Sequence, residues 1–148
     1  MTLLLVLLLA VQTDFGVRPP PGSSPETIRG SSLAASRFSC RVSYVHDGDT
    51  FRCVDGTRIR LSAIDAPEMP GACRPGHSCA PGSPYQAKAT LDGLINGRTV
   101  QCEPAGKSYN RIAAWCTVNG TDLSCAMLRS GQVVRLARYD PRGRLSRC

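Results

Sequence analysis

Two short acidic motifs in the sequence have the residue types and spacing of a cation site. Asp47–Thr50 (DGDT) lies between two stretches of alternating apolar residues, and Asp65–Glu68 (DAPE) ends the next stretch. Hard cations such as Ca²⁺ bind several oxygen atoms, which carboxylates from two turns and a backbone carbonyl can supply together. Each motif alone is typical of an ordinary turn, because Asp-Gly is a common hairpin sequence and an acid before Pro commonly ends a strand.

Two arginines accompany these acids and indicate a phosphodiester as the reacting group. Arg60 lies in the stretch that leads to Asp65, and Arg111 follows a polar segment. A divalent cation and two guanidinium groups offset the negative charge that grows when a phosphodiester is attacked, and Glu68 can accept a proton from water. The alternatives are a strand salt bridge for Arg60 and a solvated loop end for Arg111.

The charge of the chain favours the same kind of partner. Its 148 residues are enough for about one domain, and 18 Lys and Arg against 11 Asp and Glu give a net charge of +7. From residue 39 on, the net charge is +6, and Lys88 and Lys107 are the only lysines. Arginine binds phosphate bidentately, so nucleic acid is the first partner to consider, although overall composition bias explains surface arginines equally well.

Eight cysteines favour disulfides over a zinc site. All follow residue 39, their number is even, and none forms a CxxC pair. This pattern is typical of an oxidising compartment. Sequence alone leaves the 105 complete pairings open. The one pair that we expect is Cys73 with Cys79, which enclose a Pro/Gly loop.

The N-terminal part of the sequence indicates export. Residues 3–11 (LLLVLLLAV) are apolar and too few to span a bilayer. We therefore interpret 1–11 as a signal-peptide-like segment, 12–38 as a flexible linker rich in Pro, Ser and Gly, and 39–148 as the folded domain. A secreted or periplasmic location follows. No Lys or Arg precedes the apolar run, so an N-terminal membrane anchor is the alternative.

The pattern of the domain predicts a mainly β, α+β fold with five strands and two helices. Strands are expected at 40–45, 50–54, 57–64, 99–103 and 112–118, and helices at 84–95 and from Asp122 to Gly131. Residues 66–83 contain seven Pro and Gly and predict a loop, as does the polar run 104–111. A helix between the third and fourth strands is the plan of an oligonucleotide-binding (OB-type) Greek-key barrel.

Five segments carry a family resemblance. In order and spacing, VHDGDTFRC, RIRLSAIDAPE, SPYQAKATLDGLI, SYNRIAAW and AMLRSGQVVRLARYDP resemble the thermonuclease (staphylococcal nuclease-like) family over about residues 40–141. The resemblance implies an OB-type barrel and a calcium-dependent endonuclease that hydrolyses phosphodiester bonds of DNA and RNA. We expect a monomer with no obligate protein partner.

The resemblance also implies a role for each site residue. The metal ligands would be Asp49, Asp65 and the carbonyl of Ala66, with Asp49 in a turn outside the core. Glu68 would orient or deprotonate the attacking water, and Arg60 and Arg111 would hold the phosphate. Tyr109 and Tyr139 would contact the substrate.

Some positions depart from the family pattern. Ser108 stands where a lysine is frequent, and Ala137 replaces one of two aromatic residues that would face a base. The third, C-terminal helix is expected to be missing or reduced to an arginine-rich stub, with disulfides contributing stability instead. We interpret Trp115 as a core residue and His46 and His77 as structural or solvated.

Two other interpretations compete with the enzyme. The same barrel could be a non-catalytic module that binds single-stranded nucleic acid, and a small cysteine-rich structural domain would explain the disulfides. Neither needs clustered carboxylates, which would repel phosphates. The enzyme therefore explains the sequence best.

Overall fold

The structure is a computed structural model, and it describes residues 36–148. The segments predicted for 1–11 and 12–38 lie outside the described residues, apart from the last three positions. The first strand begins at Phe38. In the described part of the chain, no helix has the length and apolar character needed to cross a membrane.

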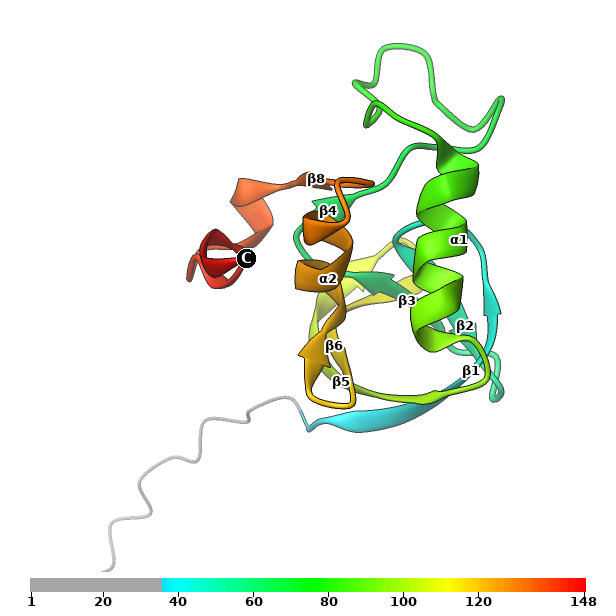
Figure 1. Cartoon of the computed structure of the whole chain (residues 1–148), viewed down its shortest axis with the longest axis vertical. Helices are drawn as coiled ribbons and strands as arrows, with labels where there is room; N and C mark the ends of the chain where they lie inside the picture. Colours follow the sequence, from blue (N-terminus) through cyan, green and yellow to red (C-terminus); the bar gives the residue numbers. More distant parts are fainter. Residues whose placement is uncertain (1–35) are drawn as a thin grey trace, which may run out of the picture. The chain divides into compact units, whose positions relative to one another are not determined.

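A closed barrel of five strands forms the body of the domain, as the sequence predicted (Figure 1). The sheet contains β1 (Phe38–Val45), β2 (Thr50–Cys53), β3 (Arg58–Leu61), β5 (Thr99–Ser108), β6 (Arg111–Val118) and the short β7 (Thr121–Asp122). Its order is β3-β2-β1-β5-β6-β7, and β3 also pairs with β6 in parallel, which closes the barrel. Strand alternation places Phe51, Ile59 and Leu61 in the buried core.

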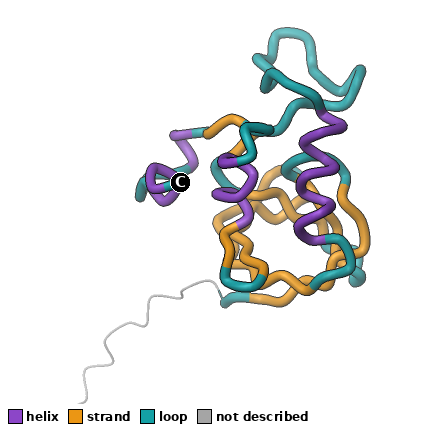
Figure 2. Tube along the Cα trace, in the orientation of Figure 1, coloured by secondary structure: helices purple, strands orange, loops and turns teal. Residues whose placement is uncertain are grey.

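Two helices pack against the barrel, and Figure 2 shows them next to one another. Helix α1 (Pro84–Ile95) begins where the Ser83 hydroxyl accepts a hydrogen bond from the Gln86 N–H. Helix α2 (Leu123–Arg129) begins where the Asp122 carboxylate accepts one from the Cys125 N–H. Such capping satisfies backbone donors that the first turn leaves free. The buried faces of both helices join the core of the barrel.

Two strand predictions were wrong in extent. The polar run 104–111 is not a loop: β5 continues to Ser108, with an irregular register at Pro104–Gly106, and turns directly into β6. The strand predicted for 57–64 is interrupted at Ala63, whose φ of 61° lies in the left-handed region. This bend separates β4 (Ile64–Asp65) from β3, and β4 pairs with β8 (Val134–Arg135).

No third long helix is present in the described C-terminal part of the chain. Instead, two 3₁₀ turns, η1 (Ala137–Tyr139) and η2 (Arg144–Arg147), follow β8. Trp115 is half-buried rather than a core residue, because its ring lies under the Arg144 guanidinium at 4.6 Å and not inside the barrel.

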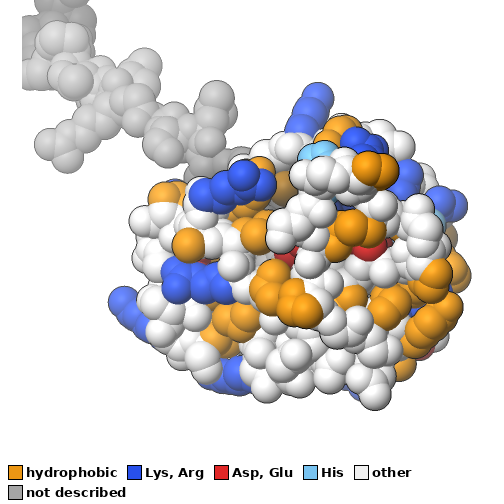
Figure 3. Space-filling model, turned by 90° about the horizontal axis from the view of Figure 1, so that it is seen from above, with side chains coloured by type: hydrophobic (Ala, Val, Ile, Leu, Met, Phe, Trp, Pro, Cys, Tyr) orange, Lys and Arg blue, Asp and Glu red, His pale blue; other side chains and the backbone are white. Residues whose placement is uncertain are grey.

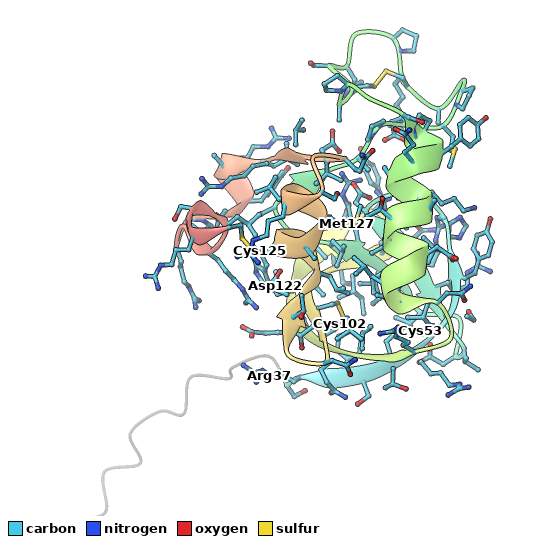
Figure 4. All side chains as sticks on the ribbon, in the orientation of Figure 1. Arg37, Cys53, Cys102, Asp122, Cys125 and Met127 are labelled. Atoms are coloured by element: carbon cyan, nitrogen blue, oxygen red, sulfur yellow. A yellow bond between two sulfur atoms is a disulfide. The ribbon has the colours of Figure 1, made fainter. Side chains whose placement is uncertain are left out.

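All eight cysteines form disulfides. The Cys73–Cys79 pair that we expected is present. The other three bonds are Cys40–Cys53, Cys102–Cys116 and Cys125–Cys148. Figure 4 shows Cys125 on the side of α2 that faces the C-terminal segment. Four disulfides indicate an oxidising location, extracellular or periplasmic.

Candidate active site

The turn between β1 and β2 carries Asp49 into the protein. The Asp47 carboxylate accepts a hydrogen bond from the Asp49 N–H at 3.0 Å and so shapes the turn. Gly48 is required here, because a Cβ atom would lie 2.6 Å from Ala87 Cβ and 2.9 Å from Ala66 Cβ. The expectation that Asp49 lies outside the core was wrong. Only 3% of Asp49 is exposed, because α1 covers this turn.

Arg60 joins the two acidic motifs. It lies on β3 opposite Thr50 of β2, and one of its nitrogens, Nη2, lies 2.9 Å from Asp49 Oδ2 and 2.5 Å from Asp65 Oδ1. The left-handed Ala63 turns the chain back after β3, which brings Asp65 to this position. The two carboxylates therefore converge on a single point that a cationic nitrogen occupies.

Arg111 is connected to the same group through Thr50. Its Nη1 donates to Thr50 Oγ1 at 3.0 Å, and the Thr50 hydroxyl donates to Asp49 Oδ1 at 2.8 Å. On its other side Arg111 donates to the carbonyl and the hydroxyl of Ser108, both at 3.4 Å. The tight turn at Tyr109, with a φ of 56°, places Ser108 and Arg111 opposite each other. Both arginines are thus held by the barrel.

Burial has the largest influence on Asp49 and raises its pKa to about 7. The Arg60 guanidinium opposes this rise, and so do hydrogen bonds from Thr50 and from the Ala66 N–H, whereas the negative charge of Asp47 adds to it. An ionised carboxylate at this depth is stabilised by a cation beside it. The carboxylates of Asp49 and Asp65 therefore favour a positive charge between them.

An open cleft of about 920 Å³ lies beside this group. Its lining includes Arg60, Asp65, Glu68, Tyr109, Arg111 and Tyr139. Lys and Arg side chains surround the face seen in Figure 3, on which acidic side chains appear only as small patches. Such a surface attracts a polyanion.

The residues predicted from the sequence divide into two sets. Asp49, Asp65, Arg60 and Arg111 form one bonded group, and the Ala66 N–H donates to Asp49 Oδ2 at 3.1 Å. The others line the same cleft but stand apart from this group. Tyr109 is 79% exposed and Tyr139 55%, and no hydrogen bond or ion pair joins the exposed Glu68 to another described residue.

Sequence reasoning missed several residues of the site. Thr50 links the carboxylates to Arg111, and the signal was its position directly after Asp49 in the DGDT motif. Arg74, from the Cys73–Cys79 loop, lines the cleft with its guanidinium 5.5 Å from the Tyr109 ring centre. Arg138 lies 4.6 Å from the ring centre of Tyr139. No spacing in the sequence indicates these last two contacts.

The oxygen atoms present fit a cation, although they do not form a complete cage. Among residues 36–148, no three His, Cys, Asp or Glu side chains come together as a metal cluster. The fit lies in the convergence of Asp49 Oδ2 and Asp65 Oδ1 on one point. Ca²⁺ binds six to eight oxygen atoms and accepts backbone carbonyls and water among them. The two converging carboxylates are oxygen ligands of the kind that such an ion binds.

Comparison with known proteins found one informative similarity. The chain is 26% identical over 114 residues to a protein of Haemophilus influenzae named as an uncharacterized endonuclease. The match covers 74% of this chain and 58% of the relative, so the chain spans little more than half the length of that protein. No family model matches the chain. The chain is therefore similar to a nuclease, on a barrel of the OB type.

Proposed function

We propose that the protein is a calcium-dependent endonuclease of the thermonuclease type that hydrolyses phosphodiester bonds of DNA and RNA. One observation carries the proposal: two carboxylates and two arginines are fixed on one barrel face, beside an open basic cleft that Glu68 also lines. The similarity to an endonuclease supports it. The four disulfides support secretion or a periplasmic location, and we propose a monomer.

Arg60 and Arg111 hold the scissile phosphate in this proposal. Their positions are fixed before substrate arrives, because each already bonds to the barrel or to a neighbouring side chain. Preorganised guanidinium groups stabilise charge best where it grows during the reaction, which here is on the phosphate oxygens. Arg111 exchanges only neutral hydrogen-bond partners for a phosphate. Arg111 therefore breaks no ion pair when it binds a phosphate.

Asp49, Asp65 and the carbonyl of Ala66 would hold Ca²⁺. The bound ion supplies positive charge that polarises the phosphate and lowers the pKa of water. Arg60 occupies the point on which the two carboxylates converge. Its guanidinium can turn to a phosphate only when another cation neutralises these carboxylates. Cation binding and phosphate binding by Arg60 are thus linked in the proposal.

Glu68 acts as the base that orients or deprotonates water. Its exposure and its lack of partners among the described residues leave the carboxylate free to accept a proton. Tyr109 and Tyr139 present exposed rings to the same cleft, where Tyr109 would contact a neighbouring phosphate and Tyr139 a base. Aromatic stacking tolerates every base, which suits an enzyme that cleaves both DNA and RNA.

The test is incubation of the purified, oxidised protein with single-stranded DNA and with RNA, in Ca²⁺ and in chelator. Cleavage in Ca²⁺ that stops with chelator is the expected result. Binding of both polymers without cleavage in either condition contradicts the proposal and identifies a non-catalytic binding module.

The metal ligands have a separate test in Asp49→Asn. This change keeps the side-chain volume but removes one of two converging charges, so calorimetry should show weaker Ca²⁺ binding together with lower activity. Asp55→Asn is the control, because Asp55 also lies next to a glycine in a turn and, like Asp49, accepts a backbone hydrogen bond, here from Thr57, but it lies outside the candidate site. Unchanged Ca²⁺ affinity in Asp49→Asn would reject the ligand assignment.

Arg60→Gln tests the link between the arginine and the cation. Removing the guanidinium takes away both a phosphate ligand and a competitor for the carboxylates. We expect turnover to fall while Ca²⁺ affinity rises. A fall in both would show that Arg60 supports the carboxylates and does not compete for them.

A further inference from the structure

A row of basic and aromatic side chains crosses the outer face of the barrel. Arg58 of β3 is paired directly with Arg52 of β2, and Arg52 is paired directly with Tyr44 of β1. Residues directly opposite one another in antiparallel strands have their side chains on the same face. Lys88 of α1 extends the row, because its Nζ donates to the Tyr44 hydroxyl at 3.2 Å. We call Arg58, Arg52, Tyr44 and Lys88 the basic row.

The row begins at the candidate site. Arg58 lines the cleft and donates to the side chain of Asn110, another cleft residue, at 3.4 Å. The Arg52–Arg58 pair is two residues along β2 and β3 from the Thr50–Arg60 pair, so the side chains of both pairs lie on the same face of the sheet. A polymer bound at Arg60 therefore meets Arg58 first as it leaves the cleft.

The charges of the row are not neutralised within the described part of the chain. No carboxylate there lies within 4.0 Å of the cationic groups of Arg52, Arg58 or Lys88. Like charges directly opposite each other destabilise a sheet, and Arg58 also has a buried Nε with no hydrogen-bond partner. The pKa of His46, beside Arg52, is lowered by burial and by Arg58 and Arg52. The arrangement therefore destabilises the folded domain, and a bound anion would neutralise the repulsion.

Tyr44 gives the row an aromatic surface. Its ring is half-exposed at 49%, with Lys88 Nζ 4.8 Å from the ring centre and the His46 ring edge-on at 4.8 Å. These two contacts hold the ring in place while part of it stays open to solvent. Alternation of cations with a fixed, exposed aromatic ring is the pattern of surfaces that bind single-stranded nucleic acid.

We propose that a single strand of the substrate leaves the cleft along the basic row, with phosphates on Arg58, Arg52 and Lys88 and a base on Tyr44. This inference rests on the proposed nuclease function and adds a substrate-binding surface outside the reacting site. From β3 to β1 the row spans two inter-strand spacings, about 10 Å. The row is therefore long enough to contact successive phosphates of a single strand. The surface would favour long single strands over short ones.

The experiment compares a 12-nucleotide single strand with a trinucleotide, whose two internucleotide phosphates are too few to occupy the cleft and the whole basic row together. Affinity is measured in chelator over a series of salt concentrations, for the parent, Arg52→Gln and Arg52→Gln/Tyr44→Ala. Arg52→Gln should reduce the slope of log affinity against log salt by about 0.7 for the 12-mer. The double variant should bind the 12-mer about 10-fold or more weakly, since stacking on one ring is worth about 5-fold or more.

The matched control is Arg98→Gln. Arg98 is also an exposed arginine, in the turn between α1 and β5, and makes no side-chain hydrogen bond or ion pair with another described residue. It should bind both oligonucleotides as the parent does. Thermal unfolding provides a second measurement, because relief of the repulsion between Arg52 and Arg58 should keep Arg52→Gln at least as stable as the parent.

The outcomes separate this inference from the proposed function. A larger loss for the 12-mer than for the trinucleotide, absent in Arg98→Gln, supports the basic row. If the parent cleaves the 12-mer but the row variants bind and cleave both substrates as the parent does, the proposal for the basic row is wrong and the proposed nuclease function is retained. If the parent neither binds nor cleaves nucleic acid, the proposed function itself fails.

Discussion

The loop at residues 66–83 and the C-terminal segment at residues 134–148 are both closed by a disulfide, yet they are held very differently. In the C-terminal segment, Asp140 is buried and accepts hydrogen bonds from the Arg135 guanidinium and from the N–H groups of Arg144 and Leu145. In the loop, residues 70–78 are all exposed, and backbone hydrogen bonds connect only near neighbours such as Met69 and Ala72. Figure 1 shows this loop extending beyond α1.

This difference separates stability from function. The C-terminal segment buries Leu145, is bonded to α2 through Cys125–Cys148 and forms an ion pair with Asp122 through Arg144. The loop buries little and instead extends Glu68 and Arg74 to the cleft. Changes at Asp140, Leu145 or the Cys125–Cys148 bond should therefore act on unfolding, whereas Tyr139 of the same segment lines the cleft. Changes at Glu68 or Arg74 in the loop should act on the reaction.

The largest effect is expected from Glu68→Gln in the loop. If Glu68 is the base, turnover should fall by about 10² to 10⁴ with little change in oligonucleotide affinity. The free energy of unfolding should stay within about 0.5 kcal/mol of the parent, because the side chain is exposed and without partners. Steady-state kinetics and thermal unfolding measure the two quantities.

Glu103→Gln is the control for this prediction, since Glu103 lies on β5 away from the cleft and pairs with Arg37 and Arg144. Its turnover should match the parent. Parent-like turnover in Glu68→Gln would place the base elsewhere.

Much of the fold could be predicted because its signals are local. Ser83 before Pro84 marks the start of α1, and alternation marks the strands that enclose Phe51 and Ile59. The extension of β5 was missed because Pro104 and Gly106 are typical of turns, whereas here they lie at a register shift inside a paired strand.

The chemistry of the site was predictable as a set of residues but not as an arrangement. The motifs indicate Asp49, Asp65 and Arg60, yet the turn that carries Asp49 packs at Gly48 against Ala87 of α1, which is distant in sequence. The contact between Arg74 and Tyr109 likewise depends on where the loop folds. Contacts of this kind are set by tertiary packing, and no local pattern records them.

The second prediction concerns the Cys125–Cys148 bond of the C-terminal segment. Cys125→Ser/Cys148→Ser opens a loop of sequence separation 23, which should lower the free energy of unfolding by about 3 kcal/mol because the unfolded chain regains conformational freedom. Denaturant unfolding measures the change. At temperatures where the variant remains folded, turnover should equal that of the parent, and a specific loss of turnover would show that this bond also positions Tyr139 in the cleft.

The third prediction is that Asp140→Asn costs about 2 kcal/mol at pH 7, since an amide cannot accept all the hydrogen bonds that the carboxylate receives. Burial raises the pKa of Asp140, but hydrogen bonds from Leu145, Arg135 and Arg144 outweigh it, so the pKa is lowered below 3.8. A lowered folded-state pKa contributes stability that is complete above the ordinary Asp value and is lost as pH falls through the folded value. Unfolding at pH 7 and at pH 2.5 should therefore show the difference between parent and variant shrink in acid. An equal difference at both pH values would contradict the ionised role.

Of the two disulfides, Cys73–Cys79 in the loop is expected to contribute less to stability, as Cys73→Ser/Cys79→Ser tests. A cross-link of sequence separation six would contribute about 2 kcal/mol if the folded loop were fixed by other contacts, because only the unfolded chain would gain freedom on opening it. The loop is exposed and has few such contacts, so opening the bond frees the folded state as well, and the change in unfolding free energy should stay below about 1 kcal/mol.

Opening this bond should weaken substrate binding instead, because a freer loop must lose more entropy to order Arg74 against the substrate. The KM for DNA should rise a few-fold, in line with about 0.5 to 1.5 kcal/mol for each immobilised side chain. Denaturant unfolding and steady-state kinetics on the same preparation measure both quantities, with the Cys125→Ser/Cys148→Ser variant as the reference for the opposite behaviour. A stability loss of about 2 kcal/mol with an unchanged KM would show that the loop is as firmly held as the C-terminal segment and is not a flexible wall of the cleft.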